Sequence, residues 1–567
     1  MEEGYVIVDG YTDEPAGLGV PPYLDVYPRY VAGAIWSNLP SAQVIYFTID
    51  EVRRSLDVFL KIASKAKAII FIAGVSVPGK YLGGTPISLE ELEFLSRVLE
   101  KPVKILGGPV AIFGIGKEGG RIAELPSRLG DSFDLVVRGD IELAVYRFIR
   151  ERSLEKVDPY ERRTDFGLID MFAVKGAKIV LQHPNYSRNL IIELETFRGC
   201  PRAIVGGCSF CIEPLYGKVI FRSVKGIAAE VKALYSYGVK CFRLGRQTDI
   251  YSYMAHDTGK YEFPKPNPRA VELLFKSIRN AAPNLKVLHI DNANPGTLAN
   301  HPTEARKITK IIVKYHTPGD VAALGVESAD PKVIKLNNLK ASPEESLEAV
   351  RIINEMGARR GYNGLPHLLP GINFVFGLIG ETKETYILNY EFLKRILEEG
   401  LLVRRINLRQ VLVFPRTRMW DVGTRVINRN KQYFKVFKEK IRKEIDLPMF
   451  RRVVPRGTIL REVYTEAYEG KNTLARQIGS YPILVYIPDL LPLGKFIDVL
   501  VIDHGYRSVT GVPYPLNVNK SSRRLLEKLP GISQRTVAKI LVRRPFKSLE
   551  DLRTLVREEQ VLKWLRV

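Results

Sequence analysis

The chain contains little cysteine, with four residues in 567. So few thiols in so long a chain cannot build a disulfide framework. Three of them, Cys200, Cys208 and Cys211, lie within one short segment. Clustering of this kind is typical of an intracellular metal or redox site.

Long apolar runs are also missing. The longest run, Ala68–Val77, is far shorter than the roughly 20 residues that a membrane-spanning helix requires. The N-terminal segment MEEGYVIVDGYTDEP is acidic and contains no basic stretch followed by an apolar stretch, so we expect no signal peptide. We therefore expect a cytoplasmic protein that does not associate with a membrane.

Acidic residues are too few to balance the basic ones. There are 62 Asp and Glu against 85 Lys and Arg, and the net charge is +23. An excess of this size favours an anionic partner, of which nucleic acid is the commonest. The alternative is a basic surface without a specific partner. The apolar content of 46% indicates an ordinary globular protein, and the length predicts three or four domains.

Short apolar runs alternate with amphipathic stretches through residues 1–155. Alternation of strands and helices predicts an α/β fold, here a Rossmann-like parallel sheet with helices on both faces. The expected strands are Tyr5–Val8, Val44–Phe47, Ala68–Ile72, Val103–Leu106 and Asp134–Val137.

A second alternating series covers residues 186–425. Its expected strands are Leu190–Leu194, Val239–Leu244, Lys286–Ile290, Val321–Val326, Gly371–Phe376 and Asn407–Val413. Six repeats are fewer than the eight of a closed TIM barrel, so we predict a partial (β/α)6 TIM-like barrel with a lateral opening for a large substrate. Short alternating runs in residues 450–515 predict a small β-barrel, and residues 516–567 are helical and basic.

The cysteine segment follows the first strand of the second series and has the spacing C-x7-C-x2-C. Thiolates suit iron–sulfur clusters and zinc alike. A structural zinc site needs four ligands, but Cys241 lies in an expected strand and His183 stands alone upstream. The spacing therefore favours a [4Fe–4S] cluster with one iron open to a small molecule. Cys241 is expected to be a small buried side chain.

This segment resembles the signature of the radical S-adenosylmethionine (SAM) superfamily, in which three cysteines follow the first barrel strand. The last two bracket an aromatic residue, here Phe210, whereas the first gap is longer than the usual C-x3-C. The resemblance implies that Cys200, Cys208 and Cys211 hold one [4Fe–4S] cluster and that its open iron binds SAM. It also implies reductive cleavage of SAM to a 5′-deoxyadenosyl radical, with an electron donor such as ferredoxin or flavodoxin.

Four further segments resemble SAM-binding motifs of the superfamily and occur in the expected order. They are Leu244–Gln247, Leu324–Ser328, Gly371–Thr382 and Val411–Thr417. The residues that the resemblance implies for cofactor binding are Phe210, Gly245, Gln247, Glu327, Ser328, Gly377 and Gly380. For Gly377 and Gly380, a role as turn residues is the alternative. The identity of the catalytic residues stays open.

Residues 1–155, through Ile105–Pro109 and Asp134–Glu142, are similar to the cobalamin-binding-like domain that precedes many radical SAM barrels. The D-x-H-x-x-G motif that ligates cobalt is missing, and no histidine precedes His183. Either cobalamin binds without a protein ligand or the domain is a structural relic, and the missing histidine favours the relic.

The layout also resembles the tRNA methylthiotransferases, which end in an RNA-binding TRAM barrel. Those enzymes carry three more cysteines in their first domain and this chain has none there, so methylthiolation by their route is not expected. Gly457–Gly511 is similar to a TRAM-type OB barrel, and Leu525–Ile540 to a helix-hairpin-helix motif. The alternatives are an ordinary barrel surface and a packing or protein-docking motif. The residues expected to contact nucleic acid are Arg476, Tyr506, Arg507, Gly531, Ser533, Arg535 and Lys539.

These features together predict a radical SAM enzyme that modifies RNA, with tRNA as the first candidate and methylation of a modified base near the anticodon as one form of the reaction. One alternative is a radical SAM enzyme that acts on a protein or a small metabolite. The other is a non-catalytic iron–sulfur protein that binds nucleic acid. DNA stays open as a substrate because hairpin motifs contact the phosphate backbone and do not separate RNA from DNA.

Overall fold

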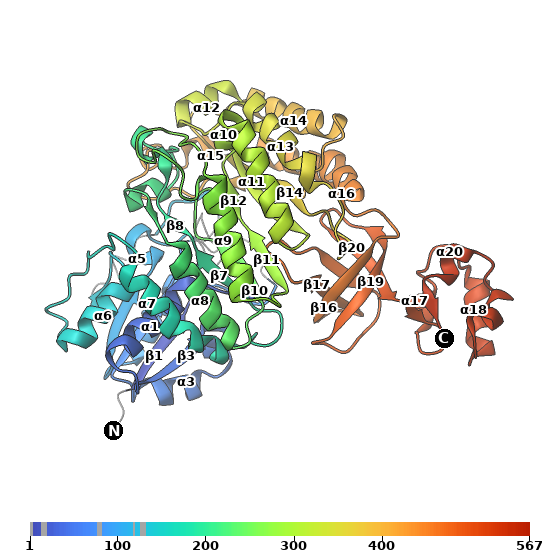
Figure 1. Cartoon of the computed structure of the whole chain (residues 1–567), viewed down its shortest axis with the longest axis horizontal. Coiled ribbons are helices and arrows are strands. Elements are labelled where there is room, and N and C mark those ends of the chain that lie inside the picture. The colour runs from blue at the N-terminus through green and yellow to red at the C-terminus, as the bar shows by residue number, and fades with distance from the viewer. Residues whose placement is uncertain (1–3, 13–19, 76–81, 117–118, 125–131) are drawn as a thin grey trace.

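The computed structural model describes residues 4–12, 20–75, 82–116, 119–124 and 132–567. Figure 1 shows an N-terminal α/β domain packed beside a larger α/β barrel, a small β-barrel against that barrel, and a helical lobe that projects from it. In the described residues, no helix combines the length and the apolar character needed to span a bilayer.

The N-terminal sheet has five parallel strands, as predicted. They are β1 (Gly4–Asp9), β3 (Gln43–Thr48), β4 (Ala68–Ile72), β5 (Val103–Gly107) and β6 (Leu135–Val136). Their order in the sheet is β3-β1-β4-β5-β6. This is a doubly wound order, in which ligands bind at the carboxyl ends of the strands where the order reverses.

Helices cover both faces of this sheet. On one face lie α1 (Val26–Asn38), α6 (Ile141–Glu151) and α7 (Gly167–Gly176), and on the other α2 (Ile49–Arg54), α3 (Leu56–Ala63) and α4 (Leu89–Val98), with the short α5 (Pro109–Phe113) after β5. A glycine allows α1 and α7 to approach closely, since a Cβ on Gly33 would lie 1.9 Å from the carbonyl oxygen of Phe172.

All six predicted strands of the larger barrel are present. They are β7 (Ile191–Glu195), β10 (Cys241–Gly245), β11 (Val287–Ile290), β13 (Asp320–Glu327), β14 (Leu368–Phe376) and β15 (Arg405–Gln410). The helices around them are α8 (Val224–Ser236), α9 (Pro268–Ala281), α10 (Pro295–Asn300), α11 (Pro302–Tyr315), α12 (Pro331–Asn337), α13 (Pro343–Gly357) and α14 (Lys383–Glu398).

The structure adds two features to the predicted partial (β/α)6 barrel. Its strands form two sheets, β11-β10-β7-β2 and β12-β13-β14-β15, with β12 at Asn292–Ala293. The strand β2 (Tyr23–Leu24) comes from the N-terminal segment and pairs in parallel with β7. The sequence did not predict β2 because a strand of two residues has no readable alternation. The first 155 residues therefore contribute an edge strand to the barrel.

Side chains of the barrel strands alternate between two environments. In β15, Ile406 and Leu408 belong to the main core beneath the helices. Arg405, Asn407 and Arg409 therefore share the opposite face, toward the inside of the barrel.

The chain leaves the barrel through α15 (Arg425–Ile441), a π-helical turn (Arg442–Asp446) and α16 (Leu447–Val453). The predicted small β-barrel follows. It is closed, in the order β16-β17-β18-β20-β19, and only its β18–β20 pair is parallel. Its strands are β16 (Ile459–Glu469), β17 (Asn472–Gln477), β18 (Leu484–Ile487), β19 (Phe496–His504) and β20 (Ser508–Tyr514).

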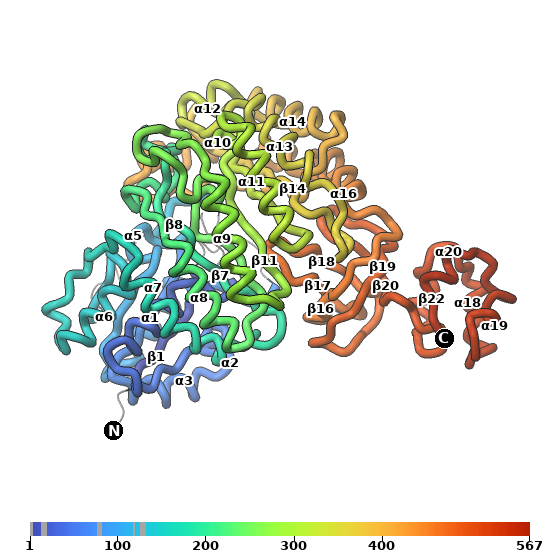
Figure 2. Tube along the Cα trace, in the orientation of Figure 1, coloured from blue at the N-terminus to red at the C-terminus, as the bar shows by residue number. Residues whose placement is uncertain are grey.

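The C-terminal lobe is mainly helical. It comprises α17 (Arg523–Leu526), α18 (Gln534–Arg543), α19 (Leu549–Arg553) and α20 (Glu559–Leu562), and its ends are joined by β21 (Leu516–Asn517) and β22 (Leu565–Arg566). Figure 2 shows the trace passing from β20 into the projecting lobe. The lobe shares a hydrophobic core with the small β-barrel.

Candidate active site

The loop that carries the three cysteines begins where β7 ends, at the carboxyl edge of the barrel sheet. A short ribbon, β8 (Phe197–Arg198) paired with β9 (Ile220–Phe221), closes its base. The long gap between the first two cysteines contains a 3-10 turn, Pro201–Val205. The N–H of Cys211 donates to the carbonyl of Cys208 at 3.2 Å, so the last two cysteines share a tight turn.

An apolar pocket surrounds the cysteine turn. Cys208 is buried, and Cys211 and the half-buried Phe210 pack with it against side chains that include Leu378 and Met419. Apolar surroundings limit the access of solvent to a bound metal group. Phe210, expected near the cofactor, lies within this pocket.

One basic side chain contacts a cysteine, and the charge of a second acts on the cysteines. Nη1 of Arg202 donates to Sγ of Cys208 at 3.0 Å, and Nε of Arg202 pairs with Glu262 at 2.7 Å. Nζ of Lys340 pairs with Glu327 at 3.0 Å. Burial alone would lower the pKa of Lys340, but the charges of Glu327 and Cys208 hold that pKa above its usual range.

The donor set fits an iron–sulfur cluster. Burial raises the pKa of the Cys200 thiol to about 11, and burial and the charge of Cys208 raise the pKa of Cys211 well above its usual range. Three thiolates placed together therefore require positive charge, which the iron ions of a cluster supply when bound. Among the described residues, no three side chains of His, Cys, Asp or Glu are arranged to hold a single metal ion.

The fourth cysteine is separate from this group. Cys241 is the first residue of β10, 6% exposed, and packs with Ile191 and Val287. Because β10 runs parallel to β7, Cys241 lies at the amino end of the sheet and the cysteine loop at the carboxyl end. The prediction of a small buried side chain is confirmed.

The two residues expected to bind SAM after β10 lie in tightly packed surroundings. A Cβ on Gly245 would lie 1.9 Å from Oε1 of Glu193, so a larger residue here would displace the buried Glu193 carboxylate. Gln247 is buried; its Nε2 donates to the carbonyl of Leu244 at 2.9 Å and its Oε1 accepts no hydrogen bond. A buried unpaired oxygen is available to a ligand donor.

Glu327 and Ser328 lie at the carboxyl end of β13. Glu327 is buried and has a φ of 65°, in the left-handed region that non-glycine residues rarely adopt. The pairing of β13 with β14 is irregular between Gly325 and Glu327, and this bulge directs the Glu327 carboxylate to Lys340. The hydroxyl of Ser328 accepts from the N–H of Asp330 at 3.1 Å.

Gly377 and Gly380 both adopt positive φ, of 90° and 85°. A Cβ on Gly377 would lie 2.3 Å from Ile427, and one on Gly380 would lie 2.5 Å from Leu336. The alternative role as turn residues accounts for both glycines, and a contact of either with SAM stays a prediction.

Comparison with known proteins identifies the fold of this site. The family model described as "Radical SAM superfamily" matches residues 194–409. This range includes the cysteine loop. It starts within β7 and contains the first residue of each of the other five barrel strands. The chain contains a radical SAM domain in residues 194–409. It is an enzyme of that superfamily, with a [4Fe–4S] cluster and SAM as its cofactors.

Full-length relatives occur in archaea. The chain is 50% identical over 511 residues to "Uncharacterized protein MJ0274" of Methanocaldococcus jannaschii, covering 89% of this chain and 92% of the relative. It is 43% identical to a protein of Archaeoglobus fulgidus, covering 98% of each. The chain therefore belongs to the same family as these proteins.

More distant matches carry functional names. The chain is 24% identical over 331 residues to "Ribosomal protein uS12 methylthiotransferase RimO" of Acinetobacter baylyi, covering 57% of this chain and 65% of the relative. The radical SAM methyltransferase TsrM of Kitasatospora setae aligns at 14% identity with a TM-score of 0.47, covering 74% of this chain and 75% of that one.

Sequence reasoning missed Arg202 and Lys340 as residues of the radical SAM site. Arg202 lies in the lengthened gap between the first two cysteines, and an arginine inside the cysteine motif was the only available signal. Lys340 is 129 positions beyond Cys211, and only folding brings it to the site.

We expect Arg202→Gln to lower the midpoint reduction potential of the cluster by roughly tens of millivolts, because a cationic N–H donor to a ligand sulfur stabilises the reduced form. Potentiometric titration followed by EPR measures this shift. Arg306→Gln, on the surface of α11, is the matched control. An unchanged potential in Arg202→Gln at full iron content would contradict the role of Arg202.

A buried set of charged residues lies where the N-terminal domain meets the mouth of the radical SAM barrel. Arg163 pairs with Glu195 at 2.5 Å and with Glu142 at 3.7 Å. Both carboxylate oxygens of Glu142, and Nε and Nη1 of Arg163, make no hydrogen bond. Burial and the neighbouring Asp140 raise the pKa of Glu142 to about 7. Buried polar atoms without hydrogen bonds are available to a polar ligand.

The amino end of the radical SAM barrel is closed by a loop of the small β-barrel. Inside, Arg243 pairs with Glu193 at 2.6 Å and with Asp291. The hydroxyl of Tyr481 donates to Asp291 at 2.6 Å, and the N–H of Ser480 donates to Nδ1 of His289 at 3.0 Å. The small β-barrel is thus attached to the polar interior of the larger one.

The residues expected to contact nucleic acid lie in three places. Arg476 pairs with Glu466 at 2.6 Å and donates to the carbonyl of Leu82, so it joins parts of the protein to one another. Tyr506 is 52% exposed at the β19–β20 turn, beside Arg507. The other four, Gly531, Ser533, Arg535 and Lys539, belong to the C-terminal lobe.

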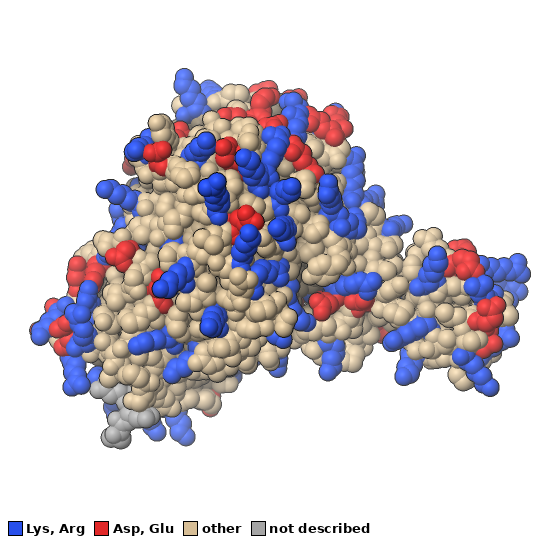
Figure 3. All heavy atoms as spheres, in the orientation of Figure 1, with Lys and Arg blue, Asp and Glu red and all other residues tan. Residues whose placement is uncertain are grey.

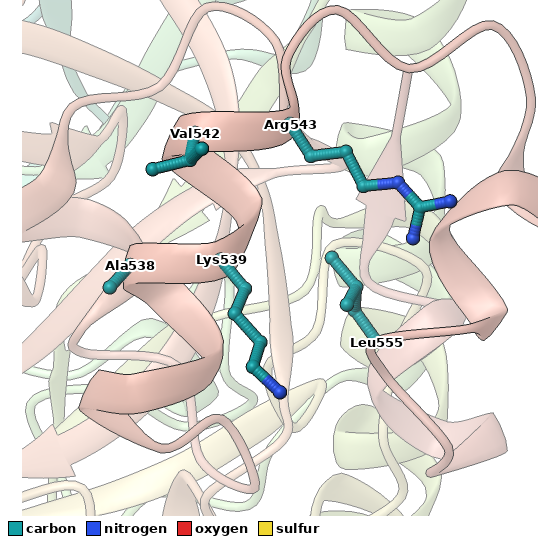
Figure 4. Close-up of a pocket in the computed structure, with 5 residues that line it drawn as sticks. All are labelled: Ala538, Lys539, Val542, Arg543 and Leu555. Atoms are coloured by element: carbon teal, nitrogen blue, oxygen red, sulfur yellow. The ribbon is translucent and has the colours of Figure 1, made fainter.

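In the lobe, Gly531 has a φ of 83° and Ser533 caps α18 by accepting from the N–H of Thr536. Arg535 and Lys539 are exposed on α18. Figure 4 shows Lys539 and Arg543 extending from α18 toward Leu555, and these three residues line an open groove with Ala538 and Val542.

Proposed function

We propose that this radical SAM enzyme modifies RNA, with tRNA as the first candidate substrate. The observation that carries the proposal is the pair of modules that follow the radical SAM barrel, a closed five-stranded β-barrel and a basic helical lobe. Closed five-stranded barrels of the OB type bind oligonucleotides. The net charge of +23 favours the same partner.

The C-terminal lobe supports this proposal through its charge and its hairpin. Figure 3 shows Lys and Arg side chains projecting from the lobe and across the visible face of the protein. The turn that contains Gly531 and Ser533 leads into α18, whose first N–H groups suit a phosphate. Lys539 and Arg543 border the groove beside it. Such contacts bind a nucleic-acid backbone without reading its sequence.

The small β-barrel supports the proposal through its exposed aromatic residue. Tyr506 is 52% exposed next to Arg507. Exposed tyrosine beside arginine suits stacking with an unpaired base and contact with its phosphate.

The reaction that we infer is alteration of a carbon centre of the RNA, such as methylation. The cluster and SAM supply the radical when bound, and an electron donor such as a ferredoxin or flavodoxin supplies the electron. The chain positions the substrate at the mouth of the barrel, where buried side-chain atoms of Arg163 and Glu142 make no hydrogen bond. The first domain offers no histidine ligand for the cobalt of a cobalamin, since none precedes His183.

The test is nucleoside mass spectrometry of tRNA and rRNA from a strain that lacks this gene. We expect one modified nucleoside to disappear and a lighter precursor to accumulate, and the mass difference identifies the group. Complementation with the wild-type gene restores the nucleoside, whereas the Cys208→Ser gene does not. Unchanged tRNA and rRNA would contradict the proposal.

A protein substrate is the second candidate. The match to RimO favours it, because the name of that relative gives a ribosomal protein as its substrate. Intact-mass analysis of ribosomal proteins from the same deletion strain distinguishes the two candidates. A mass loss in one protein with unchanged RNA would support the second.

A further inference from the structure

Five arginines gather along β15, away from the cysteine loop. Arg405 and Arg409 lie on the inward face of the strand and Arg404 directly precedes it. Arg442 comes from the π-helical turn after α15, and Arg507 from the β19–β20 turn. We call these five residues the arginine cluster.

Three of the five guanidinium groups converge on shared acceptors. The carbonyl of Ile406 accepts from Arg442 at 3.1 Å and from Arg507 at 3.4 Å. Oδ1 of Asn407 accepts from Arg405 at 2.6 Å and from Arg507 at 3.3 Å. Both acceptors are neutral. Since β15 is the last strand of its sheet, the arginine cluster lines the open edge of the radical SAM barrel.

Positive charge in the arginine cluster exceeds the negative charge around it. Within the described part of the chain, Asp446 is the only carboxylate that forms an ion pair with any member, and its partner is Arg442. Burial and the neighbouring arginines lower the pKa of Arg404 to about 9, and burial, Arg507 and Arg405 lower the pKa of Arg442 to about 10. Nε of Arg404 and Nε of Arg405 make no hydrogen bond.

Contacts with the small β-barrel account for only two members of the arginine cluster, Arg404 and Arg405. Arg404 donates to the carbonyl of Tyr481 at 2.8 Å, and Arg405 lies 4.2 Å from the centre of its ring. These contacts do not require five charges. The side chain of Arg409 is exposed and makes no hydrogen bond or ion pair with the described residues. An anionic ligand would offset the mutual repulsion of the group.

We propose that the arginine cluster binds backbone phosphates of the substrate RNA beside the nucleotide that enters the barrel. This inference rests on the proposed function. The planar fork of arginine matches the oxygens of a phosphate. Arg507 lies at the outer surface, and Arg409 lies farther along β15 toward the carboxyl ends of the strands, where the cysteine loop begins. π-Helical turns such as the one that carries Arg442 are frequent at functional sites.

The test uses the double variant Arg409→Gln/Arg507→Gln in the full-length holoenzyme. Fluorescence anisotropy measures binding to unmodified tRNA over a range of salt concentrations. We expect the affinity for tRNA to fall about tenfold or more. We also expect the slope of log K against log salt concentration to become shallower by roughly 0.7 to 0.9 for each phosphate that the variant no longer binds. Iron content and melting temperature establish that the variant is folded.

The matched control is Arg54→Gln/Arg97→Gln, which removes the same charge from exposed helices of the N-terminal domain. It should bind tRNA within about twofold of the wild type. Equal affinity of the two double variants would overturn the inference.

Failure of the proposed function gives a different result. If the wild type binds no RNA, inorganic pyrophosphate becomes the probe. The rise in melting temperature that pyrophosphate causes is then compared between the wild type and Arg409→Gln/Arg507→Gln. A rise in the wild type that is missing in Arg409→Gln/Arg507→Gln would refute RNA and retain the arginine cluster as a phosphate site. A rise in both proteins, or in neither, would overturn the phosphate site as well.

Discussion

Replacing Cys208 by Ser is expected to remove the iron–sulfur cluster and to abolish formation of 5′-deoxyadenosine. A cluster held by three thiolates loses a ligand that no other residue of the loop can replace. Cys208 also accepts the hydrogen bond of Arg202, and a serine hydroxyl can still accept this bond, so the expected effect comes from the lost thiolate ligand. Iron and sulfide content, visible absorption and a 5′-deoxyadenosine assay under reducing conditions measure the effect.

Cys241→Ser is the matched control for this experiment. Cys241 lies at the opposite end of the sheet in an apolar group, so its replacement should cost about 1 to 3 kcal/mol of folding stability and leave the iron content unchanged. Retention of the cluster in Cys208→Ser, or its loss in Cys241→Ser, would contradict the assignment of the ligands.

Arg243→Met is expected to reduce the free energy of unfolding by about 3 to 5 kcal/mol, because it leaves two buried carboxylates without their cation. Arg243 is fully buried between Glu193 and Asp291. Asp291 also holds Tyr481 of the small β-barrel, so the variant weakens the attachment of that barrel too. Denaturant titration followed by fluorescence and circular dichroism measures the loss.

The control is Arg306→Met on the surface of α11. Arg306 pairs with Glu348 and Glu355 but is 42% exposed, and exposed ion pairs contribute about 1 kcal/mol or less. A loss in Arg243→Met as small as that in Arg306→Met would show that the buried network does not hold the two barrels together.

The strands could be predicted because their signals are local. Apolar runs such as Ala68–Ile72 and Val321–Val326 identify buried strands within a few residues, and the structure has both. The cysteine motif is local in the same sense, since Cys200, Cys208 and Cys211 lie in one loop. The sequence by itself therefore determined the positions of the main strands of the α/β fold and the presence of the small β-barrel, and it predicts the ligand set of the cluster.

Only the tertiary structure decided which distant residues complete these sites. Lys340 pairs with Glu327 where its charge acts on the cysteines, Arg163 pairs with Glu195, and Arg507 joins the arginines of β15. Sequence periodicity spans none of these separations. The strand β2 pairs with β7 for a similar reason, because an edge strand of two residues is defined by its neighbour and not by its own pattern. Such contacts depend on the packing of whole domains, which buries a charge only where a partner from another segment can meet it.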